Sequence, residues 1–286
     1  MFGKIKTYAS LVKFSHTIFA MPFALTALFY AHRMDGYPIG LLLFLKILLC
    51  MVFARNAAMG FNRYADRKID AANPRTKNRE IPAGKLSAAS VLAFVIINAA
   101  LFVAVAAFIN PLTFYLSPVA LLVILGYSLT KRFTCFSHIF LGMSLAIAPM
   151  GAYIAVTGQF AVLPLILSLL VLTWSSGFDI IYSLQDKEFD CMNNLYSMPA
   201  KLGIKGSLIV SIALHILTFI AVIDIGLIYD SGTLYWIGAG IFTLLLAYQH
   251  ILVTPKNLSK VNMAFATVNG IASIIYATFT IIDFYV

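Results

Sequence analysis

Charged residues are scarce in this 286-residue chain: Asp, Glu, Lys and Arg together make up 11%, and only 11 residues are acidic. Hydrophobic residues make up 61% of the sequence, and the mean hydropathy is +0.92. A soluble domain of this length cannot bury so much apolar surface. The composition therefore excludes an ordinary soluble protein and indicates that lipid surrounds most of the chain.

Cysteine is rare as well. Cys50, Cys135 and Cys191 lie far apart and form no CxxC pair, so neither a disulfide framework nor a zinc site is predicted. The histidines also lack the spacing of metal ligands, and we interpret them as packing or interfacial residues. They are His16, His32, His138, His215 and His250. The net charge of +9 does not indicate a nucleic-acid partner, because its position follows membrane topology.

Apolar segments of about 20 residues, the length that crosses a bilayer, fill the chain from end to end. The first begins near the N-terminus and lacks a cleavage pattern, so we interpret it as a span rather than a signal peptide. The spans are predicted at Tyr8–His32, Ile39–Phe61, Ala88–Ile109, Leu112–Thr130, Cys135–Val156, Ala161–Tyr182, Ser207–Tyr229, Thr233–Leu252 and Val261–Phe284. This pattern predicts an all-α polytopic membrane bundle of nine transmembrane helices, with residues 1–286 forming one membrane domain.

Basic residues lie almost entirely on one side of this topology. The first thirteen residues and the even-numbered connections hold 17 of the 20 Lys and Arg residues, whereas the opposite connections hold only Arg33. Because such a bias sets orientation, we expect the N-terminus and the long connections at 62–87 and 183–206 to be cytoplasmic. The outer connections are too short to carry a site, so function is expected on the cytoplasmic side.

Two acidic motifs lie where spans meet these long connections. The first places Asn62, Asp66 and Asp70 four residues apart, which predicts one polar stripe on a helix. The second forms a similar stripe of Asp179, Tyr182, Asp186 and Asp190. A faint internal repeat is also present: Asp186 and Asp190 lie 120 positions after Asp66 and Asp70, respectively. The segment Ile81-Pro82-Ala83 likewise recurs as Met198-Pro199-Ala200, so two related halves are indicated.

Like charges at this spacing repel each other, and near a bilayer each bare carboxylate is costly. A divalent cation removes this conflict, and Mg²⁺ is commonly held by one or two carboxylates together with substrate phosphates. The alternative is that these acids only pair with neighbouring Lys and Arg at a wet membrane surface. The occurrence of two matched motifs, which together hold more than half of the acidic residues, favours a bridged magnesium–diphosphate group.

Cations beside the motifs suit a phosphate ligand. Arg67 and Lys68 lie inside the first motif, and Lys131 and Arg132 follow Tyr127 at the end of the fourth predicted span. All four can bind diphosphate oxygens. Topological anchoring is the alternative role, and for Lys131 and Arg132 both interpretations stay open.

With these motifs, the sequence resembles the UbiA superfamily of intramembrane prenyltransferases over essentially its whole length. The resemblance rests on the patterns NxxxDxxxD and DxxYxxxDxxxD. The similarity is closest to the 4-hydroxybenzoate polyprenyltransferase branch and its relatives in menaquinone synthesis by the futalosine route. Its further carriers are Asn73-Pro74-Arg75-Thr76, Asn78-Arg79-Glu80-Ile81-Pro82-Ala83-Gly84, Tyr182-Ser183-Leu184-Gln185-Asp186 and Tyr127-Ser128-Leu129-Thr130-Lys131-Arg132.

The resemblance implies nine helices around a central cavity, in which Mg²⁺ ions bind a polyprenyl diphosphate. Its metal ligands are then expected to be Asn62, Asp66, Asp70, Asp186 and Asp190. Arg55 matches an arginine of that branch and is the candidate for binding the acceptor's carboxylate. Two departures stand out: Arg63 replaces an Asp that many members have, and Asn194 stands where Gly is expected.

The expected reaction transfers a polyprenyl group to an aromatic acid, either 4-hydroxybenzoate or a hydroxynaphthoate, in ubiquinone or menaquinone synthesis. Mg²⁺ and the basic side chains stabilise the departing diphosphate. Tyr127 and Tyr182 are the candidates for stabilising the allylic cation through their ring faces, and Asp179 is the candidate for taking the phenolic proton. We expect a multi-pass protein of a bacterial inner membrane whose active site faces the cytoplasm, with no obligate protein partner.

Two other classes of function were weighed. A secondary transporter also uses intramembrane Asp and Asn, but it concentrates them near the midplane rather than at cytoplasmic helix ends. A membrane scaffold gives no reason for paired acidic stripes.

Overall fold

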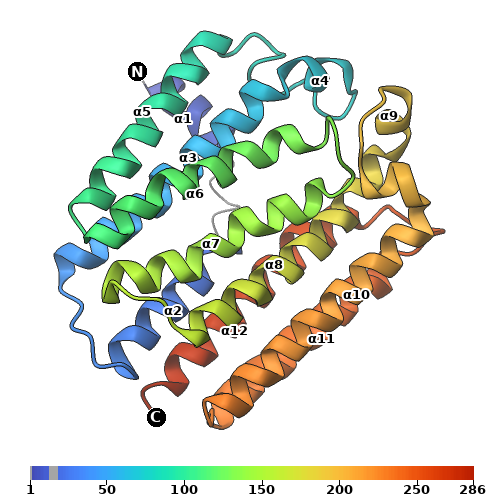
Figure 1. Ribbon diagram of the computed structural model, residues 1–286. Coiled ribbons are helices and arrows are strands. Elements are labelled where there is room, and N and C mark those ends of the chain that lie inside the picture. Colours follow the sequence, from blue (N-terminus) through green and yellow to red (C-terminus); the bar gives the residue numbers. More distant parts are fainter. Residues whose placement is uncertain (1, 13–18) are drawn as a thin grey trace. The chain divides into compact units, whose positions relative to one another are not determined.

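The computed structural model describes residues 2–12 and 19–286, and helices dominate this part of the chain (Figure 1). Three short segments, α4, η2 and α9, lie between longer helices, and η3 is a wide π-helical turn that leads into α12. The elements are α1 (Phe2–Leu11), α2 (Met21–Arg33), α3 (Leu41–Ala65), α4 (Arg67–Ala72), α5 (Ala88–Ala107), α6 (Pro111–Thr130), α7 (Ser137–Thr157), α8 (Val162–Ser183), η2 (Leu184–Asp186), α9 (Lys187–Met192), α10 (Met198–Ile228), α11 (Thr233–Leu252), η3 (Met263–Val268) and α12 (Asn269–Asp283).

Eight segments of the described chain are long and apolar enough to cross a membrane, so the predicted count of nine is not met there. The difference lies in the first predicted span, Tyr8–His32. The two ends of this predicted span belong to α1 and α2. These helices have 10 and 13 residues, so each is shorter than a transmembrane span. Lys13 and His16 lie outside the described residues. The all-α polytopic membrane fold itself is confirmed.

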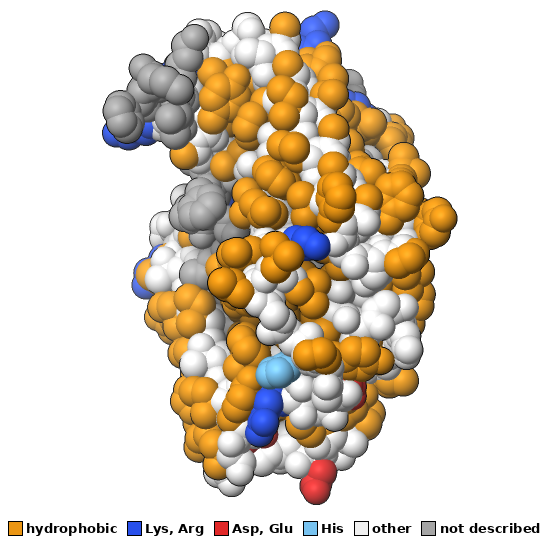
Figure 2. Space-filling model, turned by 90° about the vertical axis from the view of Figure 1, so that its left-hand side faces the viewer, with side chains coloured by type: hydrophobic (Ala, Val, Ile, Leu, Met, Phe, Trp, Pro, Cys, Tyr) orange, Lys and Arg blue, Asp and Glu red, His pale blue; other side chains and the backbone are white. Residues whose placement is uncertain are grey.

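The surface supports a lipid environment. Large apolar side chains are exposed along most of the long helices, for example Leu122 at 74% on α6 and Leu244 at 71% on α11. On the face shown in Figure 2, hydrophobic side chains cover much of the surface and charged side chains are few. An apolar surface of this extent on a soluble monomer would drive aggregation, whereas in a bilayer it contacts lipid tails.

The chain falls into two compact units. The first consists of Met1–Thr17 and Gly40–Leu129, and the second of Ile18–Ile39 and Thr130–Val286. In the first unit, α3 packs closely on α5. Gly60 permits this approach, because a Cβ there would lie 2.9 Å from Val95 Cγ2. Asn56 Nδ2 also donates a hydrogen bond across the pair to Asn98 Oδ1 at 3.0 Å.

In the second unit, six helices form a closed series of neighbours, in which α2, α7, α8, α10, α11 and α12 each contact the next and α12 contacts α2. Aromatic residues fill the space inside this series. Trp174 on α8 is fully buried against Phe23 of α2 and Phe242 of α11, with ring centroids 5.1 and 6.0 Å apart. Such contacts contribute packing energy in lipid, where burial of apolar surface alone drives little association.

The contact between α7 and α8 depends on Gly142. A Cβ at this position would lie 2.6 Å from the backbone oxygen of Leu172 and would collide with Ser176 Oγ. We therefore expect Gly142→Ala to destabilise the protein by about 1–3 kcal/mol, since a backbone oxygen cannot move away without shifting α8. Thermal melting in detergent measures this loss. Gly240→Ala is the matched control, because a Cβ there meets no atom within 4 Å, and equal melting temperatures for the two variants would contradict the prediction.

Both acidic motifs interrupt their helices, which corrects the prediction of continuous helical stripes. Asp66 separates α3 from α4 with φ −86° and ψ 3°, and Asp186 precedes α9 with φ −99° and ψ 1°. The helix that follows has six residues in each case, with Asp70 or Asp190 in its fourth position. Repulsion between carboxylates four residues apart and the low helix propensity of Asp favour such breaks. The two units thus share this local conformation, as the internal repeat indicates.

Candidate functional site: two acidic helix breaks

The first motif forms a compact polar group at the end of α3. Asn62 Nδ2 donates to Asp66 Oδ2 and to Ser128 Oγ of α6, both at 3.4 Å. The backbone N–H of Asp70 donates to the Asp66 carbonyl at 2.7 Å, so helical hydrogen bonding continues through the break. Asp66 and Asp70 are each only 3% exposed. These contacts join the side chains of Asn62 and Asp66, whereas Asp66 and Asp70 are joined through the backbone.

Asp70 is held by the loop that follows it. Arg79 Nη1 donates to Asp70 Oδ1 at 2.7 Å, and the Thr76 hydroxyl donates to the Asp70 backbone carbonyl at 3.1 Å. The loop in turn contacts α1, where Ser10 donates to Glu80 Oε1 at 2.6 Å. The second carboxylate oxygen of Asp70, Oδ2, is buried and has no hydrogen-bond partner among the described residues.

That ion pair gives a stability prediction. Arg79→Met leaves the Asp70 carboxylate buried without its ion-pair partner, and we expect a loss of about 3–5 kcal/mol in the free energy of unfolding. Adding Asp70→Asn removes the stranded charge and should restore part of the loss. Thermal melting in detergent compares these variants with Lys77→Met, an exposed cation of the same loop. If the double variant melts no higher than Arg79→Met, the loss does not come from the stranded charge.

The basic residues of the first unit are not equivalent. Arg67 lies over the ring of Tyr64, with 4.5 Å from Cζ to the centroid, and donates to the Tyr64 carbonyl at 2.7 Å. Arg55 and Arg63 of α3 both lie near Tyr127 of α6. Arg63, which stands where many family members have Asp, is 6% exposed and donates to Asn62 Oδ1 at 3.4 Å. The guanidinium of Arg63 thus lies among the polar side chains of the first motif.

The second motif repeats this arrangement in the other unit. Asp190 is 8% exposed, accepts a hydrogen bond from the Ser197 hydroxyl, and interacts electrostatically with Asp186 and Lys131. Ser197 also caps α10, because its Oγ accepts the N–H of Ala200 at 3.3 Å. Lys131 is tied to this loop through its carbonyl, which accepts the N–H of Tyr196 at 2.8 Å. The structure therefore groups three residues predicted from the sequence, Lys131, Asp186 and Asp190.

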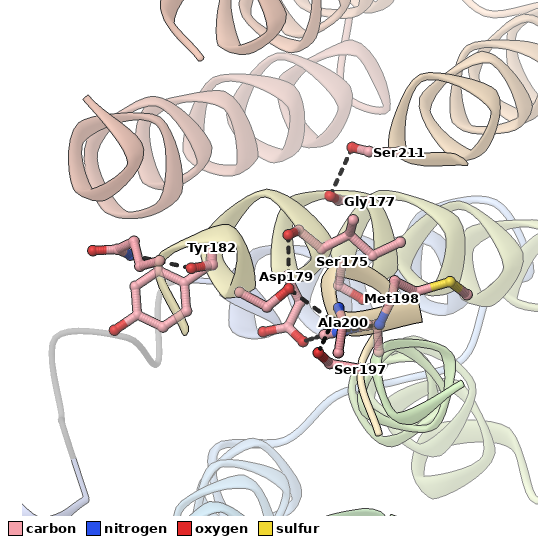
Figure 3. A network of polar contacts seen from close by, with 12 residues as sticks. Ser175, Gly177, Asp179, Tyr182, Ser197, Met198, Ala200 and Ser211 are labelled. Atoms are coloured by element: carbon pink, nitrogen blue, oxygen red, sulfur yellow. Dashed lines mark hydrogen bonds and ion pairs between the residues drawn. The ribbon is translucent and has the colours of Figure 1, made fainter. Parts of the chain in front are cut away.

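Asp179 and Tyr182 do not share one continuous polar face. Figure 3 shows Asp179 beside Met198 and Ser197, whereas the ring of Tyr182 lies apart from them. The Tyr182 ring stacks on Phe265 with centroids 4.1 Å apart. Asp179 Oδ2 lies 2.7 Å from Nδ1 of His138 on α7. Packing alone therefore does not account for His138, and the sequence carried no local signal for it, since its partner is 41 positions away.

The loop after the second motif resolves one departure from the family pattern. Asn194 has φ +52°, a left-handed conformation that Gly adopts freely and that Asn tolerates better than most residues. The Gly expected there is thus replaced by a residue that keeps the same backbone conformation.

The chemistry of the donor set suits a hard divalent cation. Each break offers two carboxylates, and the buried Oδ2 of Asp70, which has no hydrogen-bond partner among the described residues, is suited to a cation. Among the described residues, no three His, Cys, Asp or Glu side chains are grouped closely enough to hold an ion by themselves.

Comparison with known proteins agrees with the sequence resemblance. Residues 20–271 match the UbiA prenyltransferase family. A 4-hydroxybenzoate octaprenyltransferase from Tolumonas auensis is 30% identical over 224 residues, which cover 78% of each chain. Another from Paraburkholderia phymatum is 27% identical over 285 residues, covering 97% of this chain and 96% of that protein.

Solved structures agree as well. The apo structure of a UbiA homologue from Aeropyrum pernix K1 has a TM-score of 0.84 and 31% identity, covering 94% of this chain and 98% of that one. A UbiA homologue from Archaeoglobus fulgidus, bound to GPP and Mg²⁺, has a TM-score of 0.72 over 98% of this chain and all of that one. Its 20% identity supports the fold alone. None of these relatives is a transporter.

Proposed function

Because this chain belongs to the UbiA prenyltransferase family, we propose that it transfers a polyprenyl group from a polyprenyl diphosphate to an aromatic acid. The acceptor is 4-hydroxybenzoate or a hydroxynaphthoate, as in ubiquinone or menaquinone synthesis. The names of the similar bacterial proteins support an acceptor of this class. The transporter alternative has no support from the family or from the relatives cited above.

The observation that carries the proposal is the shared conformation of the two acidic breaks. Asp66 and Asp186 occupy equivalent positions in two different units, and each is followed four residues later by a buried Asp. A single structural carboxylate needs no such duplication. Because Mg²⁺ is commonly held by one or two carboxylates together with substrate phosphates, we infer that divalent ions bridge a diphosphate to the carboxylates of the two breaks.

Mg²⁺ is the ion that we assign to Asn62, Asp66, Asp70, Asp186 and Asp190, where it would act as a Lewis acid for the departing diphosphate. The chain's own cations have the complementary role. Arg67, Lys68, Lys131 and Arg132 bind the diphosphate oxygens and stabilise the charge that develops as the carbon–oxygen bond breaks. Arg67 is held by its contacts with Tyr64, so little reorganisation of this side chain is needed when the charge forms.

Aromatic and acidic side chains then act on the allylic cation and the acceptor. The ring faces of Tyr127 and Tyr182 stabilise the cation, and Tyr182 is held for this purpose by its stack on Phe265. Arg55 on α3 binds the acceptor's carboxylate. Asp179 accepts the phenolic proton, which makes the ring carbon beside the hydroxyl a better nucleophile. The apolar surroundings exclude water that would otherwise capture the cation.

Orientation and location are part of the same proposal. Both acidic breaks lie at helix ends joined to Lys- and Arg-rich loops, which the positive-inside rule places in the cytoplasm. We therefore place the site at the cytoplasmic side of a bacterial inner membrane, where a water-soluble acceptor and a lipid-soluble donor can meet.

The test is an assay of membranes that contain the protein, with labelled polyprenyl diphosphate and each acceptor in turn. The expected result is a prenylated aromatic acid and free diphosphate in equal amounts with one acceptor. Release of diphosphate without any aromatic product, with both acceptors present, would contradict prenyl transfer to an aromatic acid. Benzoate is the control, because it offers the carboxylate but no phenol.

A further inference from the structure

His138 on α7 and Asp179 on α8 form a largely buried pair between the two helices. His138 is 4% exposed, and its side chain is the more deeply buried partner, at 6% against 18% for Asp179. Every residue from Trp174 to Ile181 is buried except Asp179. One carboxylate in this stretch thus keeps an open side, while its other side contacts an imidazole.

The hydrogen bonds fix the proton on this imidazole. The backbone N–H of Met198 points at His138 Nε2 over 3.4 Å, and an amide N–H can only donate. Nε2 is therefore the acceptor, so the ring proton is on Nδ1, where it is donated to Asp179 Oδ2 at 2.7 Å. The Ser183 hydroxyl lies 3.5 Å from Nε2 but donates to the Ile180 carbonyl at 2.8 Å. His138 is thus a neutral donor to Asp179.

The same histidine connects Asp179 to the second acidic break. Met198, which donates to its Nε2, follows Ser197, whose hydroxyl binds Asp190. Figure 3 shows Asp179, Ser197, Met198 and Ala200 gathered at this point. A displacement of the imidazole would release the Asp179 carboxylate and shift the start of α10. His138 is therefore placed to fix the direction of a carboxylate relative to the proposed diphosphate site.

We propose that His138 is a positioning residue for proton removal from the aromatic acceptor, an inference that rests on the proposed prenyl transfer. Its Nδ1–H holds Asp179 Oδ2, so that Oδ1 is directed to the open side and accepts the phenolic proton. The ring carbon beside the phenol oxygen forms a new bond to the prenyl carbon. The bond between the prenyl carbon and the diphosphate oxygen breaks, and the diphosphate keeps its electron pair. Asp179 then returns its proton to the phenol oxygen as the ring carbon loses its hydrogen, so one proton leaves with the diphosphate.

The experiment compares His138→Leu with His138→Asn. Leu fills the site without a donor, whereas the Asn amide places an N–H near the position of Nδ1 and keeps the contact with Asp179. We expect His138→Leu to lower kcat by about 10- to 100-fold, within the range of proton-transfer catalysis, and to leave KM for the polyprenyl diphosphate unchanged. His138→Asn should recover most of this loss. Asp179→Asn, which keeps the volume but accepts no proton, should show the larger defect.

A second acceptor gives a readout that a purely structural role does not affect. 3-Fluoro-4-hydroxybenzoate has a more acidic phenol, so it depends less on a positioned base. The loss caused by His138→Leu or Asp179→Asn, each relative to wild type, should be several-fold smaller with this acceptor. His32→Leu, a histidine at the opposite end of the bundle, is the control and should behave as wild type with both acceptors.

An equal loss with both acceptors, while the wild type remains active, would overturn the role of His138 and leave prenyl transfer intact. A wild-type protein that forms no prenylated product with 4-hydroxybenzoate, its fluoro derivative or a hydroxynaphthoate would overturn the proposed function and this inference together. If His138→Leu does not fold, Asp179→Asn decides the question through the same comparison of acceptors.

Discussion

Replacement of Asp66 or of Asp186 by Ala is expected to reduce turnover by about 100- to 1000-fold, the range seen when one group that stabilises developing charge is removed. Each carboxylate lies at the break between a long helix and a six-residue helix. In the proposed mechanism the acids act on the departing diphosphate, so each loss should appear in kcat as well as in donor affinity. Diphosphate release from labelled donor, in membranes with Mg²⁺ and acceptor, measures both parameters.

Asp224→Ala is the matched control, because Asp224 is exposed on α10 and lies far along the chain from both motifs. It should retain wild-type turnover. The account also requires that the two motif variants behave alike, since the two breaks have the same local geometry. Full activity in either Asp66→Ala or Asp186→Ala would show that one break suffices and would contradict a shared diphosphate site.

Removal of divalent ions is expected to abolish transfer completely. The carboxylates of both breaks and the proposed diphosphate are all anions, so the carboxylates cannot bind the diphosphate without an intervening cation. Treatment with a chelator should therefore stop both diphosphate release and product formation. Addition of Mg²⁺ in excess over the chelator should restore both.

The control for this prediction is the addition of K⁺ at the same ionic strength, which restores the screening of charge but not the divalent ligand. We expect no recovery. Prenyl transfer that continues at an unchanged rate in the chelator would contradict a role for the divalent ion, and so would transfer that K⁺ restores. The Lys and Arg side chains would then be the remaining candidates for binding the diphosphate.

Hydrophobicity and length were sufficient to predict most of the helices. The predicted span Thr233–Leu252 coincides with α11, and Leu112–Thr130 differs from α6 by one residue. The first span was wrong as a single long helix, and the last one contains the π-helical turn η3. Asn269, which follows η3, donates to the carbonyls of Ala264 and Phe265, and its Oδ1 accepts a hydrogen bond from Trp174 on α8. No window along the sequence reports such a contact.

The acidic motifs could also be predicted from the sequence, because their residues lie only a few positions apart. Asn62 and Asp66 are hydrogen-bonded through their side chains, but the break at Asp66 was missed because helix periodicity assumes a regular backbone through the motif. His138 was missed for a different reason: its contact with Asp179 joins two helices and leaves no periodic signal. Ser197 had a readable local signal, since a Ser that precedes Met-Pro-Ala is a typical helix N-cap with Pro in the first turn.

The most direct test of the central claim is divalent-ion binding in the presence of a non-reactive polyprenyl thiodiphosphate. Mn²⁺ replaces Mg²⁺ in this experiment, and its electron paramagnetic resonance signal counts the bound ions in wild type, Asp66→Ala and Asp186→Ala. The account predicts that tight Mn²⁺ binding requires the thiodiphosphate and is lost in both variants. Tight binding that persists in either variant, or that needs no thiodiphosphate, would contradict a single diphosphate held jointly by the two breaks.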